Sequence, residues 1–155
     1  MPKKNGIVVM KFGGTSVADA DKIRHVAQKV VAVKEGGNKV VVTVSAMGSA
    51  TDDLIEMAKQ ITGEPSRREM DMLLSTGEQV SIALLSMAIH EKNQPCISLT
   101  GNQAGILTDN IYTNAKILSI NCNRILDELK NDKIVIVAGF QGVSRQNDIT
   151  TLGRG

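Results

Sequence analysis

The chain has 155 residues, of which 42% are hydrophobic and 22% charged, and its formal net charge at pH 7 is +2. This profile is that of one globular domain with its own core, and because aromatic residues make up only 2% of the chain the core must be aliphatic. Charges of both signs are interspersed and no basic run occurs, which argues against nucleic-acid binding as the main function.

Cysteine usage and the N-terminal sequence indicate the compartment. Cys96 and Cys122 are far apart and lack metal-ligand spacing, which favours free thiols in a reducing environment. Lys3 and Lys4 precede an apolar run that ends at Lys11, which is too short for a signal peptide or a membrane span. We therefore expect a cytoplasmic protein that does not enter a membrane.

The first predicted element is a strand at residues 7–10, a short apolar run typical of a strand covered on both faces. Lys11 then places an ammonium at the strand's carboxyl end, where open α/β sheets bind ligands. Gly13 and Gly14 lack Cβ atoms, so their amides can approach a ligand, and the helix expected next would point its positive end at the same place. These features favour a phosphate site, although a tight turn with a surface lysine has the same residues.

A helix is predicted from Asp19 or Asp21 to about residue 35, followed by a β-branched strand at 39–44. A strand, a helix and a second strand in so short a span imply a right-handed parallel crossover. The small, polar loop 45–50 leads into another helix, so two parallel strands end in loops at one edge of the sheet.

The stretch around Gly77 breaks the helical pattern. Residues 67–71 mix charges and are typical of a solvated helix start, and a buried helix is predicted over 79–91. Glu78 would then stand at the mouth of that helix. One interpretation is a helix N-terminal carboxylate that interacts with the helix dipole; the other is a carboxylate that faces a cleft and binds a cation.

Further strands are predicted at 95–99, 115–120 and 133–138, and a short helix capped by Asn121 or Asn123 lies between the last two. Residues 100–108 are predicted as a loop or hairpin. The strand at 133–138 is followed by a third glycine-bearing loop, and the sequence stops on Gly-Arg-Gly inside what resembles a fourth. We therefore expect a piece of a longer chain.

The remaining chemistry suits an amino acid and a phosphate. The sequence contains no Walker A pattern, complete G-x-G-x-x-G, Ser/His/Asp or Cys/His constellation, or zinc spacing. Lys11 and the glycine amides suit a transferring phosphoryl group. Arg154 suits a carboxylate and Glu78 suits an ammonium, and a molecule that carries both groups is an amino acid.

Six motifs in order resemble those of the aspartokinases, a family of the amino-acid-kinase superfamily. They are KFGGTSV at 11–17, TVSAMG at 43–48, Thr51-Asp52, LLSTGE at 73–78, AGFQG at 138–142 and TTLGRG at 150–155. The resemblance implies a three-layer α/β/α sandwich with a mainly parallel sheet, incomplete in this chain. Residues 1–155 would be the N-terminal portion of the catalytic domain, without the later nucleotide-binding part and the regulatory domains.

The resemblance also implies the reaction: phosphoryl transfer from ATP, with Mg²⁺, to the β-carboxylate of L-aspartate, the first step toward lysine, threonine and methionine. Lys11 would be catalytic. The cofactor-binding residues would be Lys11, Gly13, Gly14, Thr15 and Ser16, and the substrate-binding residues Ser45, Thr51, Glu78, Phe140, Thr151 and Arg154. Glu78 would bind the ammonium and Arg154 the α-carboxylate, and no residue is expected to ligate a metal. An acceptor carboxyl with an unperturbed pKa of ~3.9 is already ionised at pH 7, so no general base is needed.

Two alternatives stay open. One is a related kinase that acts on glutamate or acetylglutamate, although the acetylated nitrogen of the latter has no charge for Glu78 to pair. The other is a non-catalytic chain that only binds a ligand or partner, and we expect residues 1–155 alone to have little or no kinase activity. Exposed sheet edges favour a homo-oligomer.

Overall fold

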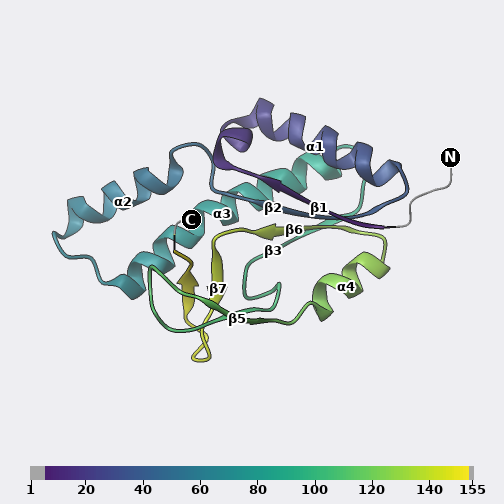
Figure 1. The fold of residues 1–155 in the computed structure, drawn as a ribbon. Helices are drawn as coiled ribbons and strands as arrows, with labels where there is room; N and C mark the ends of the chain where they lie inside the picture. The colour runs from purple at the N-terminus through teal and green to yellow at the C-terminus, as the bar shows by residue number, and fades with distance from the viewer. Residues whose placement is uncertain (1–5, 154–155) are drawn as a thin grey trace.

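The computed structural model describes residues 6–153, which fold around a four-stranded parallel sheet (Figure 1). The strand order is β1-β2-β6-β3, and every neighbouring pair is parallel. These strands are β1 (Ile7–Phe12), β2 (Lys39–Val44), β6 (Ile134–Ala138) and β3 (Cys96–Leu99). The predicted α/β/α sandwich with a mainly parallel sheet is confirmed.

Two long helices cover one face of this sheet. The helices α1 (Ala20–Glu35) and α3 (Arg67–His90) share one apolar core with alternate residues of β2 and β6. Asp19 caps α1 by accepting a hydrogen bond from the Lys22 amide at 2.8 Å, as predicted. The predicted apolar face of α1 is also confirmed, since the same residues are buried: Ile23, Val26, Ala27, Val30 and Val31.

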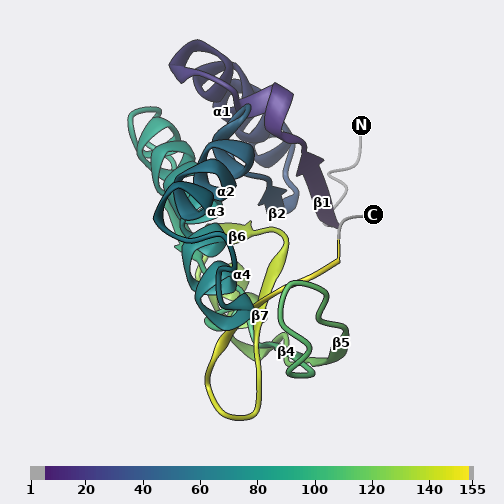
Figure 2. The ribbon, with the colours of Figure 1, turned by 90° about the vertical axis from the view of Figure 1, so that its left-hand side faces the viewer.

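The opposite face carries α4 (Asn123–Lys130) and a second sheet that the sequence did not predict. That sheet has the order β5-β4-β7-β8, and Figure 2 shows β4, β5 and β7 on the far side of the molecule from α1. Its strands are β4 (Ile106–Thr108), β5 (Ile117–Ile120), β7 (Gln141–Val143) and β8 (Ile149–Thr151). The residue before α4 is Cys122, so neither predicted asparagine is its N-cap.

The expectation that the first strand is covered on both faces is wrong within residues 6–153. β1 lies at the edge of the sheet and pairs only with β2. Ile7 and Val9 are 53% and 68% exposed, whereas Met10 and Phe12 pack on the core beneath α1 and α3. The apolar run therefore contributes only alternate side chains to the core.

The predicted break at Gly77 is also wrong, because α3 runs without interruption through that residue. A Cβ at Gly77 would lie 2.9 Å from the Cβ of Ala46, so the glycine lets α3 pack closely against the loop after β2. Glu78 is thus in mid-helix, which rules out the interpretation as a helix N-terminal residue. By length and composition α3 could cross a bilayer, but half of its most apolar window is buried, as in a core helix.

Candidate functional site

A cleft of about 530 Å³ opens where β1, β2 and β6 end. Its walls come from the turn after β1, the loop between β2 and α2 (Ala50–Ile61), the middle of α3, the turn after β6 and the segment after β8. Six of the predicted site residues line it: Lys11, Gly14, Ser45, Thr51, Glu78 and Phe140. The predicted meeting of strand ends at one edge of the sheet is therefore present.

The other predicted site residues lie elsewhere. Gly13, Thr15 and Ser16 are exposed near the cleft but are not among its lining residues. Thr151 is buried and its side chain bonds to α3 rather than facing the cleft. Arg154 lies outside the described residues.

The turn after β1 packs directly against the loop after β2. A Cβ at Gly14 would lie 2.7 Å from the Ala46 carbonyl oxygen, and the Gly48 amide donates to the Gly14 carbonyl at 3.0 Å. Any larger residue at position 14 would therefore force these loops apart. Because Gly14 allows this close contact, Lys11 and Ser45, which lie on the two segments, line the same cleft.

In place of the helix expected directly after the glycines there is a single 3₁₀ turn, η1 (Gly14–Val17). The helix α1 begins only at Ala20, and Asp19 is its N-cap. The helix whose first turn lines the cleft is instead α2, through Thr51 and Asp52. The positive end of a regular helix is thus present, but α2 supplies it.

Glu78 is the most unusual group in the cleft. It is 2% exposed, and its Oε1 accepts a hydrogen bond from the Ala46 amide at 3.2 Å. Its Oε2 is buried without a hydrogen-bond partner among the described residues. Burial raises the pKa of this carboxyl to about 7, although the backbone hydrogen bonds oppose the rise. A buried acceptor with no partner is rare, and its position in the cleft suits a cationic ligand group.

Backbone strain marks the turn after β6. Phe140 lines the cleft with a φ of 66°, a left-handed conformation that is unusual for a bulky residue. Its carbonyl accepts a hydrogen bond from the Leu152 amide at 2.9 Å, which fixes the turn to the segment after β8. Such strain is often found at ligand sites.

Sequence reasoning missed Asp71, which it placed in a solvated helix start. Asp71 is fully buried on α3 and accepts hydrogen bonds from the Thr151 amide and hydroxyl at 2.9 and 2.6 Å, and from the Thr113 amide at 3.0 Å. Its spacing of seven residues from Glu78 would have placed both carboxylates on one face of a continuous helix, but the predicted break at Gly77 hid this signal.

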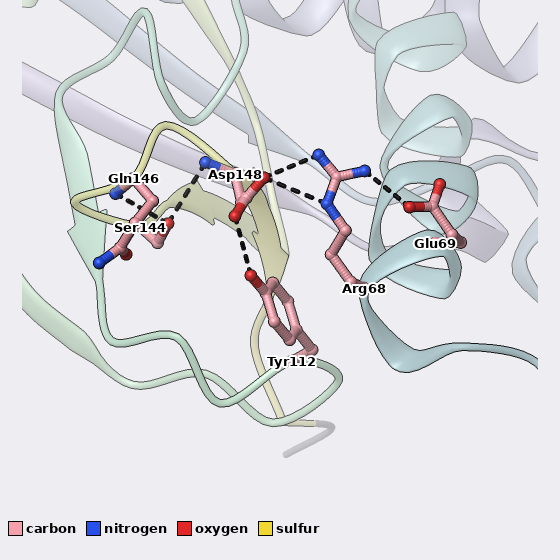
Figure 3. A network of polar contacts seen from close by, with 6 residues as sticks. All are labelled: Arg68, Glu69, Tyr112, Ser144, Gln146 and Asp148. Atoms are coloured by element: carbon pink, nitrogen blue, oxygen red, sulfur yellow. Dashed lines mark hydrogen bonds and ion pairs between the residues drawn. The ribbon is translucent and has the colours of Figure 1, made fainter.

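A second set of polar contacts ties the beginning of α3 to the turn before β8 (Figure 3). Arg68 donates to Asp148 Oδ1 at 3.1 and 2.7 Å, and the Tyr112 hydroxyl donates to Asp148 Oδ2 at 2.9 Å. Hydrogen bonds from Arg68, and then from Tyr112, hold the pKa of Asp148 below its usual range. The network joins the same three segments as Asp71 does.

Comparison with known proteins agrees with this architecture. Residues 6–155 match the family model described as the amino acid kinase family, and the chain belongs to that family.

Within the family, the chain is similar to aspartokinases. It is 59% identical to an aspartokinase of Geobacillus stearothermophilus over 150 residues, which cover 97% of this chain and 37% of that protein. The structure matches aspartate kinase from Synechocystis with a TM-score of 0.81 at 49% identity, covering 96% of this chain and 24% of that one.

A more distant structure supports the fold alone. Escherichia coli aspartokinase III, solved in complex with aspartate and ADP, matches with a TM-score of 0.83 at 23% identity, covering 96% of this chain and 44% of that one. The chain spans little more than a third of the length of the curated aspartokinases that it matches.

Proposed function

We propose that the protein containing this chain is an aspartate kinase, which transfers a phosphoryl group from ATP to the β-carboxylate of L-aspartate and forms 4-phospho-L-aspartate. The observation that carries the proposal is that one cleft is lined both by Lys11 and by Glu78, whose second carboxylate oxygen has no hydrogen-bond partner within residues 6–153. The first suits a phosphoryl group and the second suits the ammonium of an amino acid. The similarity to aspartokinases supports the choice of aspartate.

The residues present fit phosphoryl transfer to a carboxylate. The acceptor is ionised at pH 7, so the protein needs to position the two substrates and stabilise the charge that spreads over the transferring group. Lys11 supplies a positive charge, and the first turn of α2 supplies the positive end of a helix dipole. Both line the same cleft.

ATP would place its phosphates beside Lys11 and the turn formed by Gly13, Gly14, Thr15 and Ser16. Mg²⁺ would arrive on those phosphates, because this ion keeps several of its waters and usually binds through substrate phosphates with few protein ligands. When bound, the ion would neutralise part of the phosphate charge.

Aspartate would lie in the same cleft, with its β-carboxylate next to the phosphates. Glu78 would bind its ammonium, Arg154 its α-carboxylate, and Ser45, Thr51 and Phe140 would line the site. A free ammonium is what separates aspartate from an N-acetylated acid, because an uncharged amide can donate a hydrogen bond but brings no positive charge to pair with the Glu78 carboxylate. Thr151 would act through Asp71 rather than by touching the substrate.

We further propose a cytoplasmic enzyme at the first step toward lysine, threonine and methionine, as the resemblance to aspartokinases implies. A homo-oligomer is supported by the exposed apolar side chains on two edge strands, β1 and β5.

The test is an assay of ADP formation by the full-length protein that contains this chain, with aspartate, glutamate and N-acetylglutamate as acceptors. We expect turnover with aspartate and little with the other two, and little or none by residues 1–155 alone. Preferred turnover of glutamate would assign a different member of the family. If the full-length protein turns over none of the three acceptors, the proposed kinase activity is refuted, and the alternative of a non-catalytic protein that binds a ligand or partner is favoured.

A further inference from the structure

The segment after β8 forms one wall of the cleft. A carboxylate that does not itself line the cleft holds this wall in place. Leu152 and Gly153 line the cleft, and they follow Thr151 directly. The Thr151 amide and hydroxyl both donate to Asp71 of α3. Asp71 forms no ion pair within residues 6–153, so these hydrogen bonds, with those from Thr113, satisfy its charge.

Asp71 also fixes the loop that supports this wall. The Thr113 amide donates to both oxygens of Asp71 at 3.0 Å. Two residues further, the Ala115 amide donates to the Thr151 carbonyl at 2.9 Å. A Cβ at Gly153 would lie 2.2 Å from the Asn114 side-chain oxygen, so the loop and the wall are in close contact. One carboxylate therefore joins α3, the loop and the wall.

The helix α3 connects this wall to the rest of the site. Asp71 and Glu78 are seven residues apart on α3, which places them on one face and about 10 Å apart along the axis. Glu78 holds the loop after β2 through the Ala46 amide, while Asp71 holds the last residue of β8, directly before the wall. A rigid helix between the two carboxylates therefore sets the spacing between two walls of the cleft.

We propose that Asp71 is a positioning residue of the enzyme: it does not touch the substrate, but it fixes the wall formed by Leu152 and Gly153, against which aspartate binds. This inference rests on the proposed function. Loss of the Asp71 acceptors would leave the buried Thr151 amide and the part-buried Thr113 amide without their hydrogen-bond partner and would free the wall to move. Small displacements of a binding wall weaken substrate binding and orientation strongly.

The experiment uses the full-length protein and four variants. Asp71→Ala removes every acceptor, whereas Asp71→Asn keeps one oxygen for the two amides and can donate to the Thr151 hydroxyl. Thr151→Val removes a single hydrogen bond. Asp127→Ala is the matched control, since Asp127 is an exposed helical aspartate paired with Lys130 at 3.0 Å.

We expect Asp71→Ala to raise the KM for aspartate by about 10-fold or more while the KM for ATP changes by less than about 2-fold. Thr151→Val should change the KM for aspartate in the same direction by less, Asp71→Asn should restore most of the wild-type value, and Asp127→Ala should have no effect. Equal changes in both KM values, or an unchanged KM for aspartate in folded Asp71→Ala, would overturn the proposal. If Asp71→Ala does not fold, Thr151→Val decides by the same criterion: an unchanged KM for aspartate in that variant would overturn the proposal.

Hydrogen exchange of the Thr113 and Thr151 amides separates this inference from the proposed function. Both amides should exchange faster in Asp71→Ala than in Asp127→Ala whatever the substrate is. Unchanged exchange would show that Asp71 does not hold the wall. Faster exchange in a protein that does not phosphorylate aspartate would refute the proposed function and the role of Asp71 in aspartate binding. It would not refute the inference that Asp71 holds the wall in place.

Discussion

Because one oxygen of Glu78 has no partner in the part of the chain that the structure describes, Glu78→Gln is the most informative change in the full-length protein. Glutamine has the same shape and can still accept the hydrogen bond from the Ala46 amide, so the loop after β2 should stay in place. The change removes the charge and, with the oxygen on the Ala46 amide, places the NH₂ group where the ammonium of aspartate is proposed to bind.

The size of the effect follows from burial. The pKa of Glu78 rises from an ordinary value of 4.5 to about 7 mainly because burial disfavours the charged form, which corresponds to about 3 kcal/mol against ionisation. An ammonium beside Oε2 would recover much of this energy. We therefore expect Glu78→Gln to raise the Kd for aspartate by roughly 100-fold.

The pH dependence gives a second readout of the same group. Below pH 7 the free protein carries a protonated Glu78 that must lose its proton to bind an ammonium, so aspartate affinity should fall by up to about tenfold per pH unit between pH 7 and about 5. Above pH 7 the affinity should be flat through pH 8. Glu78→Gln should lose this slope.

Calorimetric titration of aspartate into the wild type, Glu78→Gln and Glu91→Gln between pH 5.5 and 8 provides the measurement. Glu91 is an exposed glutamate just after α3 and serves as the matched control. The role assigned to Glu78 is refuted if Glu78→Gln binds aspartate within about 3-fold of the wild type at pH 8, or if the two proteins share one pH profile.

Three further outcomes follow from the structure. Because its folded-state pKa is raised to about 7, the Glu78 carboxyl favours folding below pH 4.5 and loses this contribution as pH rises to 7. In urea titrations the unfolding free energy of Glu78→Gln, relative to that of the wild type, should therefore increase by up to about 3 kcal/mol over that range. Lys11→Ala should lower kcat by about 100-fold and change the KM for aspartate by less than about 3-fold. Replacement of the exposed Lys29 by alanine should leave both kcat and KM unchanged. Gly14→Ala should reduce the unfolding free energy by about 1–3 kcal/mol because its Cβ meets backbone, whereas Gly13→Ala, with open space around its Cβ, should be tolerated in the same titration.

Local sequence patterns were enough to predict the strands of the four-stranded parallel sheet and the helix α1. The strands β2 and β6 are β-branched runs, and the apolar spacing of α1 matches its buried face. Parallel pairing follows from the short crossover between β1 and β2. Each of these features depends on residues that are close together in the sequence.

The features that were missed depend on distant residues. The partners of Asp71 are 42 and 80 residues away, and the close neighbour of Gly77 is Ala46 in another loop. The strands β4, β7 and β8 have three residues each, too few for a periodic pattern. Exposure of one face of β1 depends on its position in the strand order, which no local pattern contains.

The two buried carboxylates of α3 differ in a way that supports Glu78, and not Asp71, as the proposed binding group. Both lie in the same helix and are almost inaccessible to solvent. Asp71 has donors for both oxygens, all from this chain, and so needs nothing further. Glu78 has one amide for one oxygen and, within residues 6–153, no donor for the other. A buried acceptor without a donor weakens the folded state, and the position of this oxygen in the cleft that Lys11 also lines supports the proposal that a ligand donor binds it.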